Sequence, residues 1–338
     1  MKLLSVAIPS YNSESYLRHA VDSLLAGGED LEILIINDGS TDGTASIADE
    51  YQNRYPRIVR AVHQENGGHG SAVMRGLNEA QGLYYKVVDS DDFVDQNALK
   101  EVLDTLKRFR QPVSQIDLLI SNYVYDKVGV KRAHAVGYVN ALPRDRVFTW
   151  DDVGRFRVGQ YILMHSAIFR TELLRTCGLQ LPSHTYYVDN LFVYVPMVQV
   201  EKMFYLDVDL YHYFIGRADQ SVQEQVMIKR LDQQIRVNKL MSEAVDLCSI
   251  HCIPKRRYLR NHLEIVSTVS SVLAIKSGAS EKLQKRDELW SYFRRHTPGN
   301  ERMLSRRPLG KVSQFRGLVG RQFVIYCYRI SRRIYNFN

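Results

Sequence analysis

The chain has 338 residues, enough for one large domain or two ordinary ones. Its composition, 45% hydrophobic and 24% charged, excludes a disordered chain, a disulfide-dense miniprotein and a collagen-like repeat. No apolar run approaches the roughly 18 residues of a membrane span, and residues 1–9 lack the features of a signal peptide. The four cysteines suit a reducing compartment, and Cys248 and Cys252 are expected on a buried helical face rather than in a zinc site. We therefore expect a cytoplasmic protein.

The net charge of +8 is distributed unevenly along the chain. Residues 1–228 contain 22 basic and 29 acidic residues, whereas residues 229–338 contain 23 basic and 8 acidic ones. No acidic residue follows Glu301. Such an asymmetry indicates that the two parts have different tasks, and that the second one faces an anionic partner.

Apolar periodicity predicts alternating strands and helices in the first 125 residues. Strands are expected over residues 3–8, 31–36, 58–62, 84–88 and 117–123, and helices over 13–25, 41–55, 72–80 and 97–109. Repeated strand–helix units with short links predict an α/β fold, with a Rossmann-like, mostly parallel central sheet flanked by helices.

The pattern becomes looser over residues 126–185 and then turns helical. Two further strands are expected over 166–170 and 202–206, and a helix over 189–199. Long helices are predicted over residues 228–247, 256–275 and 281–293. We place a domain boundary near residue 225, which gives an α/β domain over 1–225 and a helical, basic region over 226–338.

Four polar segments lie where a sheet of this kind binds ligands, at the carboxyl ends of strands or before a helix. They are Ile8-Pro9-Ser10-Tyr11-Asn12, Asn37-Asp38-Gly39-Ser40, Asp89-Ser90-Asp91-Asp92 and Tyr186-Tyr187-Val188-Asp189-Asn190.

The acidic turn at residues 89–92 has two interpretations. Three carboxylates within four residues repel one another unless they are solvated or neutralised by a cation. Oxygen ligands suit Mg²⁺ or Mn²⁺, which would neutralise a departing diphosphate. Alternatively, the turn is a solvated one in which Asp92 or Asp95 caps the next helix.

Taken together and in this order, the four segments resemble those of the family 2 glycosyltransferases, which are inverting enzymes of the GT-A fold that use nucleotide-diphosphate sugars. The resemblance is strong over residues 3–110 and looser over 160–225. It implies that Pro9, Tyr11 and Asn12 line the nucleotide pocket and that Asp38 contacts the base, commonly uracil.

The same resemblance implies roles for the carboxylates that follow. Asp91 would be the direct metal ligand, with Asp89 nearer the ribose and Ser90 in the same donor-binding motif. Asp189 would be the general base that deprotonates the acceptor hydroxyl in a single in-line displacement. The chain has Val188 where the family usually has glutamate, so the polarity on the acceptor side is altered.

The glycine-rich stretch that begins near residue 66 departs from the commonest family pattern. Its Gly68-His69-Gly70-Ser71-Ala72 is more similar to members that glycosylate polyprenyl phosphates. Backbone N–H groups near Gly68 and the side chain of Arg75 are candidates for binding donor phosphate. A tight turn, with Arg75 on a solvated helix face, is an equal alternative.

Residues 211–221 resemble the family segment that folds over the donor diphosphate. The resemblance implies that His212 completes the metal shell and that Arg217 or Ser221 holds phosphate. Packing is the main alternative for His212, and His69 and His165 are further candidates for contact with substrate.

The basic C-terminal residues 302–338 are interleaved with aliphatic and aromatic residues at helical intervals. This pattern favours a helix on an anionic membrane surface, which would suit a lipid-linked acceptor. A packed helix with solvated arginines is the main alternative. Contact with nucleic acid lacks a supporting fold signature, and we expect none.

We therefore expect a Mn²⁺- or Mg²⁺-dependent inverting glycosyltransferase. It would move a sugar, most often UDP-linked, to a saccharide or lipid-linked acceptor during synthesis of a surface polysaccharide, on the inner face of the plasma membrane. Alternatives are a polyprenyl-phosphate glycosyltransferase, a non-catalytic nucleotide-sugar-binding scaffold and, least of all, a nucleotide-sugar pyrophosphorylase. Whether the chain forms a homo-oligomer stays open.

Overall fold

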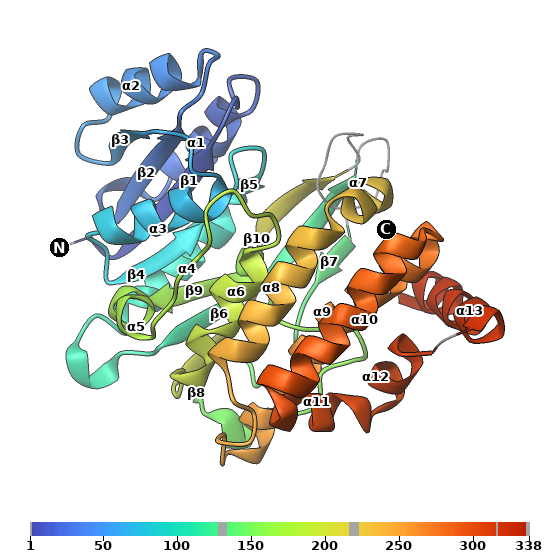
Figure 1. Ribbon diagram of the computed structural model, residues 1–338. Helices are drawn as coiled ribbons and strands as arrows, with labels where there is room; N and C mark the ends of the chain where they lie inside the picture. The colour runs from blue at the N-terminus through green and yellow to red at the C-terminus, as the bar shows by residue number, and fades with distance from the viewer. Residues whose placement is uncertain (1, 128–133, 216–222, 316, 336–338) are drawn as a thin grey trace. The chain divides into compact units, whose positions relative to one another are not determined.

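The computed structural model describes residues 2–127, 134–215, 223–315 and 317–335 (Figure 1). The chain divides into two compact units, Met1–Gly216 and Arg217–Asn338. The first unit is a mixed α/β unit and the second consists of helices.

The first unit is built on a 10-stranded sheet with the main order β3-β2-β1-β4-β9-β6-β10-β5. Its strands are β1 (Leu4–Ser10), β2 (Leu31–Asp38), β3 (Val59–Gln64), β4 (Tyr84–Val87), β5 (Phe93–Val94), β6 (Leu118–Lys127), β7 (His134–Val136), β8 (Val147–Phe148), β9 (Ala167–Arg170) and β10 (Met203–Ile215). Its helices are α1 (Leu17–Leu25), α2 (Thr44–Arg54), α3 (His69–Glu79), α4 (Gln96–Lys107), α5 (Thr171–Thr176) and α6 (Asp189–Tyr194), with short 3₁₀ turns between elements.

Strands β3, β2, β1 and β4 are mutually parallel, as the strand–helix alternation predicts. Strand β9 then pairs antiparallel with both β4 and β6, so the complete sheet is mixed. Strand β10 runs parallel to β6 and is much longer than the strand expected over residues 202–206. This length carries Tyr211 and His212 toward the carboxyl ends of the first strands.

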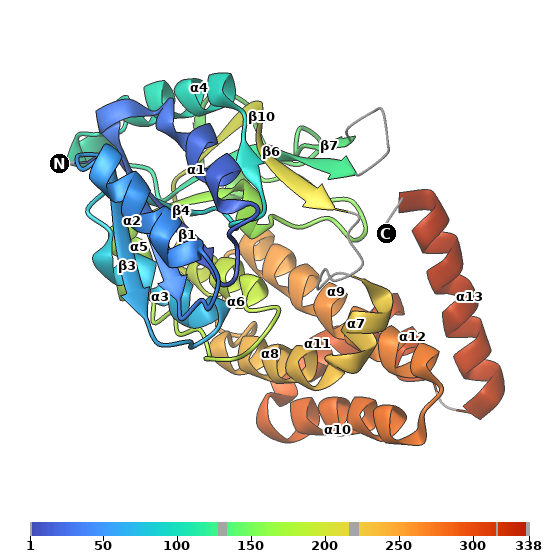
Figure 2. The same ribbon diagram turned by 90° about the horizontal axis from the view of Figure 1, so that it is seen from above.

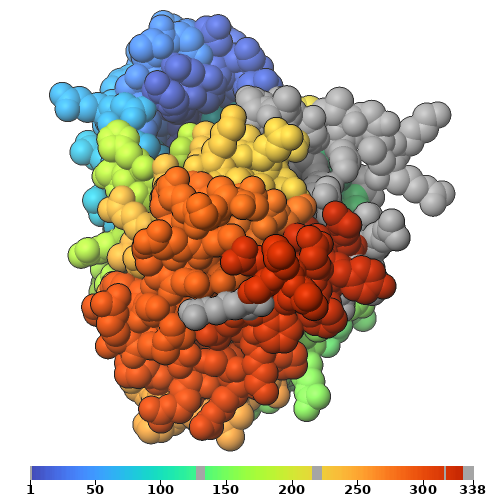
Figure 3. All heavy atoms as spheres, turned by 45° about the vertical axis from the view of Figure 1, so that its right-hand side comes forward, coloured from blue at the N-terminus to red at the C-terminus, as the bar shows by residue number. Residues whose placement is uncertain are grey.

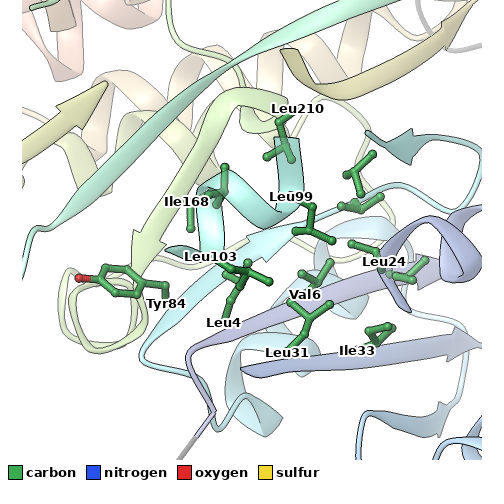
Figure 4. Packing of buried hydrophobic residues seen from close by; sticks show 14 of the residues in the cluster. Leu4, Val6, Leu24, Leu31, Ile33, Tyr84, Leu99, Leu103, Ile168 and Leu210 are labelled. Atoms are coloured by element: carbon green, nitrogen blue, oxygen red, sulfur yellow. The ribbon is translucent and has the colours of Figure 1, made fainter. Parts of the chain in front are cut away.

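Alternation along the buried strands places a different helix layer on each face of the sheet (Figure 2). On one face, Leu4, Val6 and Ile8 of β1 belong to a core that also contains residues of α1, α2 and α4. Figure 4 shows several of these side chains meeting. On the other face Gly76 of α3 approaches β1 so closely that an added Cβ would lie 2.6 Å from Cβ of Ala7.

Local chemistry explains where two of the helices begin or end. Asp95 is the N-cap of α4, and its side chain accepts hydrogen bonds from the N–H groups of Asn97 and Ala98. The helix expected over residues 189–199 ends at Tyr194. Pro196 opens a 3₁₀ turn directly afterwards, because a proline cannot continue the α-helical hydrogen-bond pattern.

The second unit contains α7 (Glu224–Lys229), α8 (Leu231–Ala244), α9 (Ile253–Ser277), α10 (Ser280–His296), α11 (Pro298–Ser305), α12 (Pro308–Ser313) and α13 (Gly317–Tyr335). Helices α8, α9 and α10 pack together, with polar contacts inside the packing such as Trp290 Nε1 to Ser271 Oγ at 3.1 Å. Cys248 and Cys252 lie between α8 and α9, not on a helical face. In the part of the chain that the structure describes, no helix combines the length and the apolar content needed to cross a bilayer.

Candidate functional site

The loops that follow β1 and β2 are tied together by Asn12. Its backbone has a positive φ of 49°, and its side-chain Oδ1 accepts a hydrogen bond from the N–H of Thr41 at 2.9 Å. The N–H of Asn12 donates to Ser40 Oγ at 3.0 Å. Pro9 is buried within β1, whereas the ring of Tyr11 is 54% exposed. The predicted nucleotide-lining segment is therefore hydrogen-bonded to the loop after β2 and carries one exposed aromatic side chain.

Asp38, the last residue of β2, is buried and holds the glycine-rich loop. Its two carboxylate oxygens accept hydrogen bonds from the N–H groups of Gly67 and Gly68, each at 2.8 Å. Gln64 Nε2 adds a third hydrogen bond at 2.7 Å. Gly68 has a φ of +81°, and an added Cβ would lie 3.0 Å from the backbone of His184. Glycine is needed there for both reasons.

Asp89 lies between two histidines just beyond β4. Nε2 of His69, the first residue of α3, is 2.8 Å from Asp89 Oδ1. Nε2 of His165 is 3.7 Å from Asp89 Oδ2. Burial opposes ionisation of Asp89, but the imidazoles of His165 and His69 outweigh it and hold its pKa well below the usual range. The carboxylate is therefore charged.

Asp92 is almost fully buried and is held by β10. The hydroxyl of Tyr211 donates to Asp92 Oδ2 at 2.5 Å, and the N–H of Phe214 donates to Asp92 Oδ1 at 2.9 Å. Burial, followed by the charges of Asp91 and Asp89, raises the pKa of Asp92 well above its usual range. Tyr211 also accepts a hydrogen bond from the N–H of Asp89 at 3.2 Å, so it links the carboxylate of Asp92 to the backbone of Asp89.

Asp89, Asp92 and His165 form a group of side chains suited to a divalent cation. One ligand atom from each lies within 4.8 Å of the others. Nδ1 of His165 is buried and has no hydrogen-bond partner among the described residues. Carboxylate oxygens with one imidazole fit Mn²⁺ or Mg²⁺. Asp91 and His212, which the sequence suggests as ligands, are not part of this group.

Asp189 is the first residue of α6, on the same side of the unit. Burial raises the pKa of Asp189, while the nearby imidazoles of His165 and His69 act in the opposite direction. Tyr187 has a positive φ of 67°, and its ring centroid lies 6.3 Å from that of Tyr186, whose side chain is exposed. The structure thus brings Asp189 into the electrostatic surroundings of Asp89, His69 and His165.

Two predicted donor or metal residues have other partners. Arg75 Nη2 lies 2.9 Å from Glu79 Oε1 on a half-exposed turn of α3. Nδ1 of His212 lies 2.5 Å from Asp126 Oδ2, and its ring stacks on Phe93 with the centroids 4.7 Å apart. These are the contacts of a packed side chain, which is the alternative interpretation of His212. They arise because β10 extends far enough to place His212 against β5 and β6. Arg217 and Ser221 lie outside the described residues.

Ser90 and Lys86 complete the surroundings of the acidic turn. Ser90 Oγ lies 2.7 Å from Ser13 Oγ, which joins the turn to the loop after β1. Nζ of Lys86, a buried residue of β4, donates to the carbonyl oxygen of His165 at 2.6 Å. Burial lowers the pKa of Lys86 to about 7. The sequence pattern contains no signal for Lys86 or Tyr211, because both act through partners distant in the chain.

Comparison with known proteins agrees with this architecture. Residues 5–171 match the glycosyl transferase family 2 model. The chain is 36% identical over 118 residues to the glycosyltransferase EpsJ of Bacillus subtilis. The aligned region covers 35% of this chain and 33% of that protein. The chain is also 36% identical over 108 residues to the minor teichoic acid biosynthesis protein GgaA of Bacillus subtilis, covering 30% of this chain and 24% of that protein. Each match therefore spans a third or less of the relative.

The fold has a similar counterpart among solved structures. S. aureus TarS residues 1–349 match with a TM-score of 0.71 and 20% identity, covering 98% of this chain and 92% of that chain. A second structure of the same TarS segment, solved in complex with UDP-GlcNAc, matches with a TM-score of 0.54 at 18% identity, covering 87% of this chain and 92% of that chain. The likeness confirms the expected GT-A type of α/β fold with a helical C-terminal part. The chain belongs, through its first unit, to glycosyl transferase family 2.

Proposed function

We propose that this protein transfers a sugar from a nucleotide-diphosphate sugar to a hydroxyl group of a saccharide or lipid-linked saccharide. The expected nucleotide is UDP. The product would belong to a cell-surface polysaccharide. The observation that carries the proposal is the grouping of Asp89, Asp92 and His165, together with the electrostatic influence of His165 and Asp89 on the partly buried Asp189, in the unit that matches the family. The name of the relative GgaA supports a cell-surface polymer as the product. The UDP-GlcNAc complex of TarS supports a nucleotide-diphosphate sugar as the donor.

In the proposed reaction, Asp189 accepts the proton of the acceptor hydroxyl as its oxygen attacks the anomeric carbon. The attack displaces the nucleotide diphosphate from the opposite face and inverts the configuration at that carbon. An aspartate with a raised pKa remains a competent base at neutral pH and takes the proton more readily than an ordinary one.

A divalent cation would be held by Asp89 and Asp92 with His165, joined by Asp91 from the same turn. When bound, it supplies positive charge that stabilises the leaving diphosphate. His69 keeps Asp89 oriented through the 2.8 Å contact. On the donor side, Pro9, Tyr11, Asn12 and Asp38 would line the nucleotide pocket, with Gly68 and Ser90 at its edge, and Asp38 also holds the loop in place. Arg75 would have to leave Glu79 to reach a phosphate.

The donor site can be tested without knowing the acceptor. Thermal unfolding should be measured with UDP, GDP, CDP and dTDP and the matching sugars, with and without Mn²⁺. A ligand at 100 times its dissociation constant adds about 2.7 kcal/mol to the free energy of unfolding. We expect Mn²⁺-dependent stabilisation by one base. No shift with any nucleotide at millimolar concentration would reject the enzyme and favour a scaffold.

Asp189→Asn separates the enzyme from a scaffold of the same fold. The amide cannot accept the acceptor proton, so we expect sugar transfer to fall by about 100-fold or more while nucleotide binding is retained. The exposed Asp104, which pairs with Lys107 on α4, offers the matched control Asp104→Asn. Equal transfer by both variants would remove Asp189 from the mechanism.

We also propose that α13 contacts an anionic membrane surface. Its side chains Leu318, Val319 and Tyr326 are 79%, 86% and 62% exposed. On another side of the helix Val324 is buried against α9. Figure 3 shows atoms of this segment, in red, at the molecular surface. Apolar exposure together with basic residues such as Arg321 and Arg329 suits an interfacial helix.

Binding to vesicles at physiological salt tests the membrane contact. We expect phosphatidylglycerol vesicles to bind the protein, and the double variant Leu318→Ser, Val319→Ser to bind more weakly. Val113, which is 87% exposed in the first unit, offers the control Val113→Ser. Equal binding by the double variant and the control would leave α13 as an ordinary packed helix.

A further inference from the structure

The second unit contains a pocket of about 340 Å³ that the proposed reaction does not use. Four arginines line it: Arg260 of α9, Arg302 of α11, and Arg306 and Arg307 directly after α11. Cys248 and Gly299 form another part of the wall, and an added Cβ at Gly299 would lie 2.7 Å from Cys248 Sγ. The volume lies at the lower end of ordinary ligand pockets, which measure roughly 300–1,000 Å³.

Only one of the four guanidinium groups is neutralised within the described residues. Arg307 pairs with the buried carboxylate of Glu264. Arg260, Arg302 and Arg306 form no ion pair or side-chain hydrogen bond with any residue that the structure describes, and Nε of Arg260 is buried without a partner. The pocket therefore has a positive charge that the chain itself leaves uncompensated.

The electrostatics of Arg260 show that this arrangement is unfavourable without a ligand. Burial and then the charge of Arg307 lower the pKa of Arg260, and Glu264 offsets this only in part. Arg256 and Arg257 on the same helix act in the same direction as Arg307. A buried donor without a partner destabilises a protein, and more so when it is charged. A bound anion would remove this penalty.

We propose that this pocket binds a phosphate ester. Guanidinium groups form paired, charge-assisted hydrogen bonds with phosphate oxygens, and the tetrahedral arrangement of those oxygens can engage several arginines at once. A planar carboxylate offers only two oxygens. The volume also admits the sugar or alcohol attached to the phosphate. If the proposed sugar transfer is correct, on which this last assignment rests, the ester belongs to the acceptor.

Direct binding to the full-length protein tests the pocket. Calorimetric titrations with inorganic phosphate and with the diester glycerophosphoglycerol should be performed at constant ionic strength, adjusted with NaCl. We expect wild type to bind the diester, and Arg260→Gln and Arg302→Gln each to bind it roughly tenfold or more weakly. Arg295→Gln is the matched control. Arg295 is exposed on α10 and does not line the pocket, so this substitution removes the same charge elsewhere.

Two further measurements separate the outcomes. Without ligand, Arg260→Gln should melt no lower than wild type, because it removes an unpaired charge on a partly buried side chain. A lower melting temperature would contradict the proposal. Stabilisation by UDP with Mn²⁺ should be unchanged in this variant, since every proposed donor residue that the structure describes lies in the first unit. If wild type does not bind UDP at all, the proposed function is rejected instead.

The source of the ester is decided by comparing a soluble and a membrane form. Binding of glycerophosphoglycerol that depends on Arg260 supports a soluble phosphodiester chain. Binding to phosphatidylglycerol vesicles alone, again dependent on Arg260, supports a lipid headgroup. Equal binding of the diester by wild type, Arg260→Gln and Arg295→Gln would overturn the proposal. So would a wild type that binds neither the diester at millimolar concentration nor the vesicles.

Discussion

Asp89 contacts three parts of the chain that are distant in sequence, through its carboxylate and its backbone N–H. His69 comes from the start of α3, His165 from the turn before β9, and Tyr211 from β10. The two imidazoles lower the pKa of Asp89 and keep it ionised, although burial opposes ionisation. Asp92, three residues later, has its pKa raised because burial dominates there. Neighbouring carboxylates thus differ because their partners differ.

Replacing Asp89 by asparagine should remove stabilisation by Mn²⁺. The neutral amide loses the charge that a hard cation requires, while the shape of the side chain is kept. We expect the shift of the melting temperature with Mn²⁺ and UDP to disappear in Asp89→Asn and to persist in Asp104→Asn. A full shift in Asp89→Asn would place the cation elsewhere.

The pH dependence of transfer should reflect the raised pKa of Asp189. A general base must be deprotonated, so kcat/KM falls as the pH drops through its pKa in the free enzyme. Because burial raises this pKa, the acidic limb should lie above the value of about 3.9 of an ordinary aspartate. A rate that stays constant down to pH 4 would show that Asp189 does not limit the reaction.

Among the elements, α9 shows what burial does to a titratable group inside a helix. His262 is fully buried, and burial lowers its pKa to about 3. The native state therefore keeps His262 neutral over a pH range in which the unfolded chain becomes protonated. Stability of the helical unit should decrease as the pH falls from about 6.5 toward 3, by at most about 1.4 kcal/mol per pH unit.

His262→Leu should remove much of this sensitivity to acid. Guanidinium unfolding at pH 7 and pH 4.5 should show a smaller loss of stability in the variant than in wild type. His296 on α10 is exposed, and His296→Leu serves as the control that should retain the wild-type loss. If His262→Leu and wild type lose the same free energy of unfolding, another group causes the sensitivity.

Elements with strong local patterns could be predicted, and those that depend on pairing could not. The strands and helices of the first 125 residues follow from apolar periodicity, and α8, α9 and α10 from their helical spacing. The extent of β10 depends on its pairing with β6, which includes two shifts of register. Its local sequence alone does not reveal this length, nor the contacts with Asp126 and Phe93 that it gives His212.

For the whole molecule, the two units have separate hydrophobic clusters. We therefore expect calorimetry to show two unfolding transitions. UDP with Mn²⁺ should raise only the transition of the first unit, because the described donor and metal residues all lie there. Glycerophosphoglycerol should raise only the other one. A single transition that both ligands shift equally would contradict this separation.

Local sequence patterns are enough to predict the α/β class, the helical C-terminal part, the family resemblance and the placement of Asp38, Asp89 and Asp189 beside strand ends or a helix start. These features follow from local periodicity and from residue types at fixed spacing. Local patterns do not predict the hydrogen bond from Tyr211 to Asp92, 119 residues away in the chain, or the pocket that arginines of α9 and α11 share. Such contacts depend on strand register and helix packing, which long-range burial sets and no local pattern specifies.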